Sequence, residues 1–163
     1  YEPADLQSIV TRAAGILDVD LDEEGAAEIA RRSRGTPRIG NRLLRQVRDF
    51  AQVERSGVVD GPVARDGLAF FGVDDLGLDK PSREILSVLC RRFDGGPVGL
   101  KTLSISVSES EDTVEDVYEP YLIQQGLLHR TPKGRVATAA AYDHLGMNRP
   151  AVPVRRAGFL FED

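Results

Sequence analysis

A helix start lies in the middle of the most basic stretch of this 163-residue chain. Seven arginines and no acidic residue fall between Arg31 and Arg48, although the formal net charge of the whole chain is -5. Within that stretch, Thr36 can cap the first free N–H groups of a helix, and Pro37 fits the first helical turn because it has no N–H to lose. The sequence therefore predicts that a helix begins at this proline, within a concentration of positive charge.

Arg38 follows the proline, at the positive end of the helix dipole. An arginine at this position is unfavourable for the helix alone. It becomes favourable when an anion such as a phosphate binds at the helix N-terminus. Two interpretations stay open from the residues: a surface helix with a solvated basic face, and a helix start that binds phosphate.

The bulk composition is that of a globular protein, with 41% hydrophobic residues. There is no run of eighteen apolar residues, so no membrane-spanning helix is expected. Cys90 is the only cysteine, which excludes an internal disulfide and fits a cytosolic setting. Tyr1 is not a natural start residue, so we expect the chain to be a segment of a longer protein.

Apolar residues recur at helical spacing in the first half of the chain. The spacing predicts helices over residues 4–17, 22–34, 36–50 and 61–71, with an extended connector at residues 58–59. Short helices of this kind predict a small bundle over residues 1–72. Residues 73–80 contain three acids and little periodicity, and we expect them to form a linker.

In the second half of the chain, the pattern of residues predicts helices and a β-hairpin in the order of a winged-helix domain. Helices are expected over residues 81–93, 100–107, 112–125 and 139–145, an extended piece over 97–99, and strands over 127–131 and 135–138. A Pro132-Lys133-Gly134 turn joins the two strands. We therefore expect a mainly α protein, with a winged-helix domain over residues 81–146 and a flexible tail over 147–163.

Several runs of residues resemble, in order along the chain, the RuvB family of bacterial AAA+ ATPases. They are Tyr1-Glu2-Pro3-Ala4-Asp5-Leu6-Gln7, the basic stretch from Arg31 to Arg45, residues 93–100 (FDGGPVGL), residues 119–126 (EPYLIQQG) and residues 130–138 (RTPKGRVAT). The resemblance extends from Tyr1 to about Gly146. It implies a small AAA+ helical lid domain, with a sensor-2 arginine, followed by a winged-helix DNA-binding domain with a β-hairpin wing.

The resemblance also implies a function for the full-length protein. That function is an ATP-dependent DNA helicase that drives Holliday junction branch migration in recombination, DNA repair and the SOS response. It implies ATP with Mg²⁺ as cofactor, a cytoplasmic homohexamer on duplex DNA, and the RuvA tetramer and RuvC resolvase as partners. Because the sequence contains no Gly-x-x-x-x-Gly-Lys-Ser/Thr loop, we expect this segment alone to lack ATPase activity.

The site residues follow from the same resemblance. Arg38 is expected to contact the nucleotide phosphates, and Tyr1 the base and sugar. In the wing, Arg130 and Arg135 are expected to contact DNA. Lys133 adds a third positive charge at the same turn, and such charges at a hairpin tip can follow a phosphate backbone, although an ordinary solvated turn would look the same.

One position departs from the family pattern. Some family members have an arginine where this chain has Glu111, and the neighbouring positions 109, 112, 115 and 116 are acidic as well. An acidic helix repels a major groove, so the departure favours backbone contact through the wing.

For the remaining candidate site residues, the sequence favours structural roles. His129 and His144 lack companion ligands, so no metal site is expected. Cys90 lies among apolar residues and is interpreted as a core thiol. Glu119 precedes Pro120 inside a predicted helix, which favours a proline-kinked helix over a catalytic carboxylate.

Two other kinds of protein stay open as alternatives. One is a free-standing winged-helix DNA-binding regulator or initiator module with a helical dimerisation domain, and the other is a scaffold module from another AAA+ family. A phosphate-binding loop encoded upstream of Tyr1 would favour the motor, and a start codon there would favour the regulator.

Overall fold

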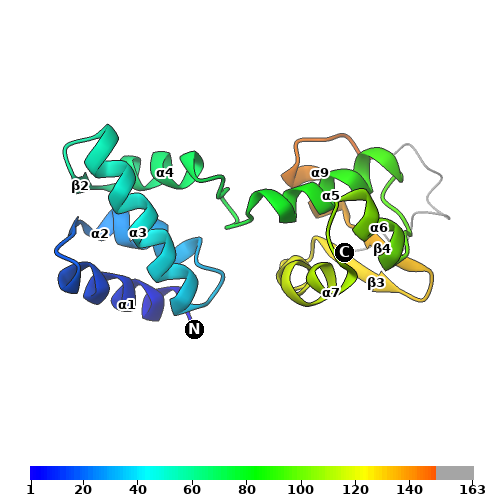
Figure 1. The fold of residues 1–163 in the computed structure, drawn as a ribbon, viewed down its shortest axis with the longest axis horizontal. Coiled ribbons are helices and arrows are strands. Elements are labelled where there is room, and N and C mark those ends of the chain that lie inside the picture. Colours follow the sequence, from blue (N-terminus) through cyan, green and yellow to red (C-terminus); the bar gives the residue numbers. More distant parts are fainter. Residues whose placement is uncertain (150–163) are drawn as a thin grey trace. The chain divides into compact units, whose positions relative to one another are not determined.

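The computed structural model describes residues 1–149, which form two units that divide between Asp79 and Lys80 (Figure 1). Both units are built mainly from helices, and the strands of the described residues belong to two two-stranded sheets. The mainly α class predicted from the sequence is confirmed. The predicted tail begins at residue 147, and its residues 150–163 lie outside the described part of the chain.

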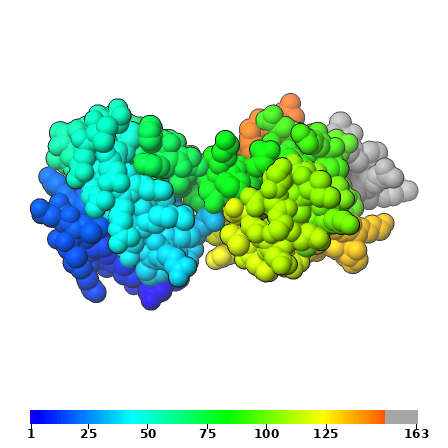
Figure 2. Space-filling model, in the orientation of Figure 1, coloured from blue at the N-terminus to red at the C-terminus, as the bar shows by residue number. Residues whose placement is uncertain are grey.

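Unit 1, residues 1–79, is a helical bundle with a small parallel sheet. Its elements are α1 (Pro3–Ile16), β1 (Asp20–Leu21), α2 (Glu23–Arg31), α3 (Pro37–Glu54), β2 (Val58–Val59) and α4 (Gly61–Phe70). Figure 2 shows the side chains of α1, in blue, packed beside those of α3, in cyan. All four helices contribute to one core, in which Val10, Ile29, Leu44 and Leu68 are fully buried.

The helix starts of unit 1 follow from local sequence. The Thr36 hydroxyl accepts a hydrogen bond from the Ile39 N–H at 3.2 Å, and Pro37 is the first residue of α3, as predicted. Aspartates cap the two neighbouring helices in the same way, Asp22 at 2.7 Å for α2 and Asp60 at 2.9 Å for α4. These caps satisfy backbone donors that the first helical turn leaves free.

The second helix ends earlier than the apolar spacing predicted, at Arg31 instead of residue 34. Arg34 and Gly35 have φ values of 55° and 71°, which belong to the left-handed region and cannot continue an α-helix. The fully buried Ser33 donates its hydroxyl hydrogen bond to the Ile29 carbonyl at 2.5 Å. The chain therefore reverses in a tight, anchored turn just before α3.

Unit 2 has the order of a winged helix. Its described elements are α5 (Lys80–Arg92), α6 (Leu100–Ser106), α7 (Glu111–Thr113), η1 (Val114–Tyr118), α8 (Glu119–Gln124), β3 (Leu128–Thr131), β4 (Gly134–Ala137) and α9 (Ala139–His144). β3 and β4 are antiparallel and place Arg130 opposite Arg135. The predicted extended piece is confirmed, because the Val98 N–H donates to the Arg135 carbonyl at 2.9 Å.

A glycine is required where this extended piece crosses the wing. Gly134 has a φ of 134°, and a Cβ there would lie 2.5 Å from the carbonyl carbon and oxygen of Val98. Any side chain would push the two segments apart.

The helix predicted over residues 112–125 is interrupted. It consists of α7, the π-helical turn η1 and α8, and the Glu119 N–H donates to the Val114 carbonyl five residues earlier. A proline ring clashes with the carbonyl four residues before it in an α-helix, and the wider turn makes room for Pro120. The helix is capped by Ser110 at 3.1 Å and not by the predicted pair Asp112-Thr113.

The described residues contain neither a membrane-spanning helix nor a cluster of metal-binding side chains. No helix in residues 1–149 is long and apolar enough to cross a membrane. The same residues contain no group of three or more His, Cys, Asp or Glu side chains able to hold a metal ion.

Cys90 is a buried core thiol, as predicted. Burial raises its pKa to about 11, while a hydrogen bond with Tyr142 and the charge of Arg91 act in the opposite direction. The folded protein therefore holds Cys90 as a neutral thiol at neutral pH.

We expect Cys90 to react slowly with Ellman's reagent in the native protein at pH 8. The thiolate is the reactive form, and each unit by which the pKa is raised lowers its fraction about ten-fold. The same protein in 8 M urea is the control, and its reaction should be faster by at least about that factor. Equal rates in the two conditions would contradict the buried thiol.

Candidate functional site

The basic stretch separates into paired and unpaired arginines. Arg38, Arg42 and Arg45 are exposed on α3, and within residues 1–149 they have no hydrogen-bond or ion-pair partner. By contrast, Arg31 and Arg32, before the turn, are bonded to other parts of unit 1. The sequence alone did not separate these two sets.

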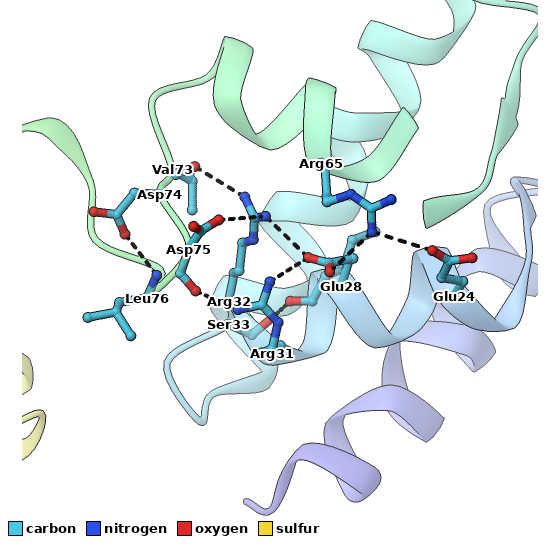
Figure 3. Close-up of polar contacts among 11 residues, drawn as sticks. Glu24, Glu28, Arg31, Arg32, Ser33, Arg65, Val73, Asp74, Asp75 and Leu76 are labelled. Atoms are coloured by element: carbon cyan, nitrogen blue, oxygen red, sulfur yellow. Dashed lines mark hydrogen bonds and ion pairs between the residues drawn. The ribbon is translucent and has the colours of Figure 1, made fainter. Parts of the chain in front are cut away.

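The paired arginines bind residues 73–79, which we call the strap (Figure 3). These residues were predicted to form most of a linker. The contacts are from Arg31 Nη1 to the Asp75 carbonyl (2.7 Å), from Arg32 Nη1 to the Val73 carbonyl (3.4 Å), from Arg32 Nη2 to Asp75 Oδ1 (3.3 Å) and from Arg34 Nε to the Gly77 carbonyl (2.9 Å). The strap is thus bound to the C-terminal end of α2 and to the turn that follows it.

Glu28 balances the charge of these arginines from within α2. Its carboxylate lies 2.7 Å from Arg31, 3.2 Å from Arg32 and 3.5 Å from Arg65 of α4 (Figure 3). Burial acts to raise the pKa of Glu28, but the Arg31 hydrogen bond and the three positive charges together lower it below its ordinary value. Glu28 therefore remains ionised and keeps the guanidinium groups in place.

The strap is itself a folded loop. Asp74 Oδ1 accepts hydrogen bonds from the Leu76 N–H at 3.0 Å and the Leu78 N–H at 2.9 Å, and Leu78 is fully buried. Gly77 has a φ of 81°, and a Cβ there would lie 2.6 Å from the Arg32 carbonyl oxygen. This glycine allows the strap to lie directly on the backbone of α2's last turn.

The two residues expected to contact nucleotide are near the same turn. The backbone nitrogen of Tyr1 lies 3.5 Å from the Gly35 carbonyl oxygen, and the Tyr1 side chain is exposed. Arg38 is exposed three residues beyond Gly35. A guanidinium at a capped helix start that has no partner among the described residues can receive a phosphate without first losing a bond, and the exposed position of Arg38 is compatible with this.

The wing differs from the expectation of three outward-facing charges. Arg130 Nε donates to Glu119 Oε1 at 3.0 Å, and Arg135 Nε donates to Glu119 Oε2 at 2.9 Å. Arg135 also lies 3.1 Å from the Glu115 carboxylate, and its side chain is only 14% exposed. Arg130 remains 43% exposed, and Lys133 is exposed at the turn.

Glu119 is the functional-site residue that the sequence did not reveal. Its side chain is completely buried, and it accepts from both wing arginines. The hydrogen bond to Glu119 raises the pKa of Arg135 above its ordinary value, although burial opposes this shift. The π-helical turn precedes Glu119 directly, and no feature of the sequence apart from Pro120 indicated that turn.

Loss of the Glu119 carboxylate should destabilise unit 2. Glu119→Ala leaves two guanidinium groups without their buried partner, which costs about 3–5 kcal/mol in the free energy of unfolding. The matched control is Glu115→Ala, because Glu115 is 44% exposed and, among residues 1–149, its side chain forms one ion pair, with Arg135. That change should cost no more than about 1 kcal/mol. Urea unfolding followed by circular dichroism measures both, and an equal loss in the two variants would contradict the buried anchor.

Both units match models of known protein domains. Residues 1–74 match the RuvB AAA lid domain, and residues 75–146 match the RuvB C-terminal winged helix domain. The chain is also similar to the Holliday junction branch migration complex subunits RuvB of Nocardioides sp., with 60% identity over 92% of this chain, and of Saccharopolyspora erythraea, with 57% identity over all of it. It spans 42% and 46% of the lengths of these two relatives.

A solved structure shows the same likeness. The structure described as the Thermotoga maritima RuvB Holliday junction branch migration motor is 42% identical and superposes with a TM-score of 0.87. The match covers 92% of this chain and 50% of that one. Two family models that together account for residues 1–146, with relatives near 60% identity, show that this chain belongs to the RuvB family.

Proposed function

We propose that the full-length protein is an ATP-driven DNA helicase that moves Holliday junctions by branch migration, and that this chain is its lid and DNA-contacting portion. The names of the relatives support the proposal, since they are subunits of a branch migration complex or, in Thermotoga maritima, its motor. The single observation that carries it is Arg38, which is exposed at the capped start of α3 and has no partner within residues 1–149.

In this proposal Arg38 senses the charge of the nucleotide. ATP with Mg²⁺, bound by a domain outside this chain, supplies a phosphate group whose negative charge falls when the terminal phosphate leaves. Arg38 binds that group from the lid, and its attraction weakens after hydrolysis. Because Thr36 caps α3 and Pro37 begins it, a change in the position of the bound Arg38 can displace the first turn of this helix.

In this proposal, the exposed part of the wing contacts DNA. Lys133 and the outer edge of Arg130 can meet a phosphate backbone, while Arg135 supports Arg130 through their shared partner Glu119. Backbone contact is independent of sequence, which suits a protein that must move along any DNA. Glu111 and Asp112 are exposed and acidic, and this argues against the alternative of a sequence-specific regulator that docks a helix in a groove.

The proposal extends to the assembly. It includes a cytoplasmic homohexamer on duplex DNA, with the RuvA tetramer and RuvC resolvase as partners in recombination and repair. We propose residues 1–72 as the lid and 81–146 as the winged-helix domain. The connecting residues 73–80 include the strap, which is bonded to the lid side.

Arg38→Ala in the full-length protein should abolish ATP-driven branch migration while the protein folds normally. The side chain is exposed and has no partner among the described residues, so the free energy of unfolding should change by less than about 0.5 kcal/mol. Phosphate release and migration of a synthetic four-way junction measure the effect, with the isolated 163-residue chain as a blank that releases no phosphate. Wild-type rates in the variant would disprove the sensor role.

Lys133→Ala should weaken DNA binding by the hexamer and lower its salt dependence. Each lost phosphate contact reduces the slope of log affinity against log salt by about one. Arg12→Ala is the control, because Arg12 is an exposed arginine of α1 in unit 1. Titration of a fluorescent duplex at several salt concentrations measures both variants, and an unchanged slope for Lys133→Ala would remove the wing from the DNA-binding surface.

A further inference from the structure

The turn between α2 and α3 lies just before Arg38, and Arg34 bonds this turn to the strap. Arg34 donates from Nε to the Gly77 carbonyl at 2.9 Å, and its Nη2 lies 3.4 Å from the Asp79 carboxylate. The Arg34 side chain is 12% exposed, and its backbone has the left-handed φ of 55°. Only three residues separate this anchored arginine from Arg38.

The turn between them is stiff. The Thr36 N–H donates to the Ser33 carbonyl at 3.1 Å, and the buried Ser33 hydroxyl is bonded to α2. Across the turn, a Cβ at Gly40 would lie 3.1 Å from Ser33 Oγ, so α3 and the turn are in close contact. A displacement of the first turn of α3 therefore moves Arg34 as well.

Hydrogen bonds also fix the conformation of the strap. Its last residue directly precedes the second unit. Asp74 binds the N–H groups of Leu76 and Leu78, and Leu78 is buried in unit 1. After Asp79 the chain continues directly into α5, which starts at Lys80. The strap is therefore the last segment of unit 1 before α5 begins.

The surroundings of Arg32 indicate that these bonds fix the position of the strap. Its side chain is 4% exposed, and its Nε has no hydrogen-bond partner among the described residues. Removing a guanidinium from water is costly, and an apolar side chain can often replace a buried ion pair without loss of stability. What an arginine supplies here, and an apolar residue does not, is directional bonding to Val73 and Asp75.

We propose that Arg32 and Arg34 are positioning residues that pass the displacement of Arg38 to the strap, and through it to the start of α5. The inference rests on the proposed function, because it requires that Arg38 responds to nucleotide. It adds that the strap is the connection by which this response reaches the DNA-contacting unit. Coupling of this kind needs a continuous chain of packed and bonded groups, and the turn and the strap form one.

The test separates hydrolysis from movement in the full-length protein. Arg34→Met keeps the length of the side chain and removes its bonds to Gly77 and Asp79. We expect KM and kcat for ATP hydrolysis near the wild-type values, and a fall of at least about five-fold in junction migration per ATP hydrolysed. Arg34→Lys should restore part of the ratio, because an ammonium group keeps the charge that pairs with Asp79 but lacks the planar fork of the guanidinium group.

A second variant approaches the same bonds from the strap. Asp79→Asn removes the charge that pairs with Arg34 and should lower the same ratio, even if Arg34→Met fails to fold. Arg48→Met is the matched control, since among residues 1–149 Arg48 forms its ion pair with its neighbour Asp49, at 3.0 Å, and not with a residue of the strap. Its ratio should equal that of the wild type.

The outcomes distinguish this inference from the proposed function. If Arg38→Ala stops migration but Arg34→Met and Asp79→Asn keep the wild-type ratio, the strap is not the connection. The inference is also overturned if hydrolysis and migration fall together in proportion to a loss of thermal stability. If Arg38→Ala itself has wild-type activity, the proposed function fails first.

Discussion

The position of a few carboxylates decides what the arginines of the basic stretch and of the wing can do. Glu28 and Asp75 hold the guanidinium groups of Arg31 and Arg32, and the buried Glu119 holds those at the wing. A guanidinium with such partners becomes part of the structure, because an incoming phosphate would have to compete with a bond already formed. The arginines without partners remain available for a ligand.

Three exposed arginines that have no partner within residues 1–149 lie together on α3. Arg38, Arg42 and Arg45 follow one another on α3 at spacings of four and three residues, and like charges at this spacing cost a helix about 0.2–0.5 kcal/mol for each pair. An anion near the helix start offsets this repulsion and interacts favourably with the helix dipole. The unfavourable local electrostatics of α3 thus agree with the proposed role of Arg38 in nucleotide sensing.

Much of the fold could be predicted from the sequence, because its signals are local. Thr36 and Pro37 fix the start of α3, and apolar spacing located most of the helices and the hairpin within a few residues. The differences are local too: α2 ends at Arg31, before a turn that contains the left-handed Arg34, and a π-helical turn precedes Pro120. The residues proposed to bind nucleotide and DNA came from the family resemblance, and their roles remain predictions.

The sequence by itself determined the helix starts, the mainly α class and the membership in the RuvB family, since caps, periodicity and ordered motifs are properties of neighbouring residues. Only the tertiary structure decided that residues 73–79 form a bonded strap and that Glu119 lies beneath the wing arginines. Both contacts join residues that are distant along the chain. Which charges meet across such distances depends on how helices pack, and no local pattern of residues records it.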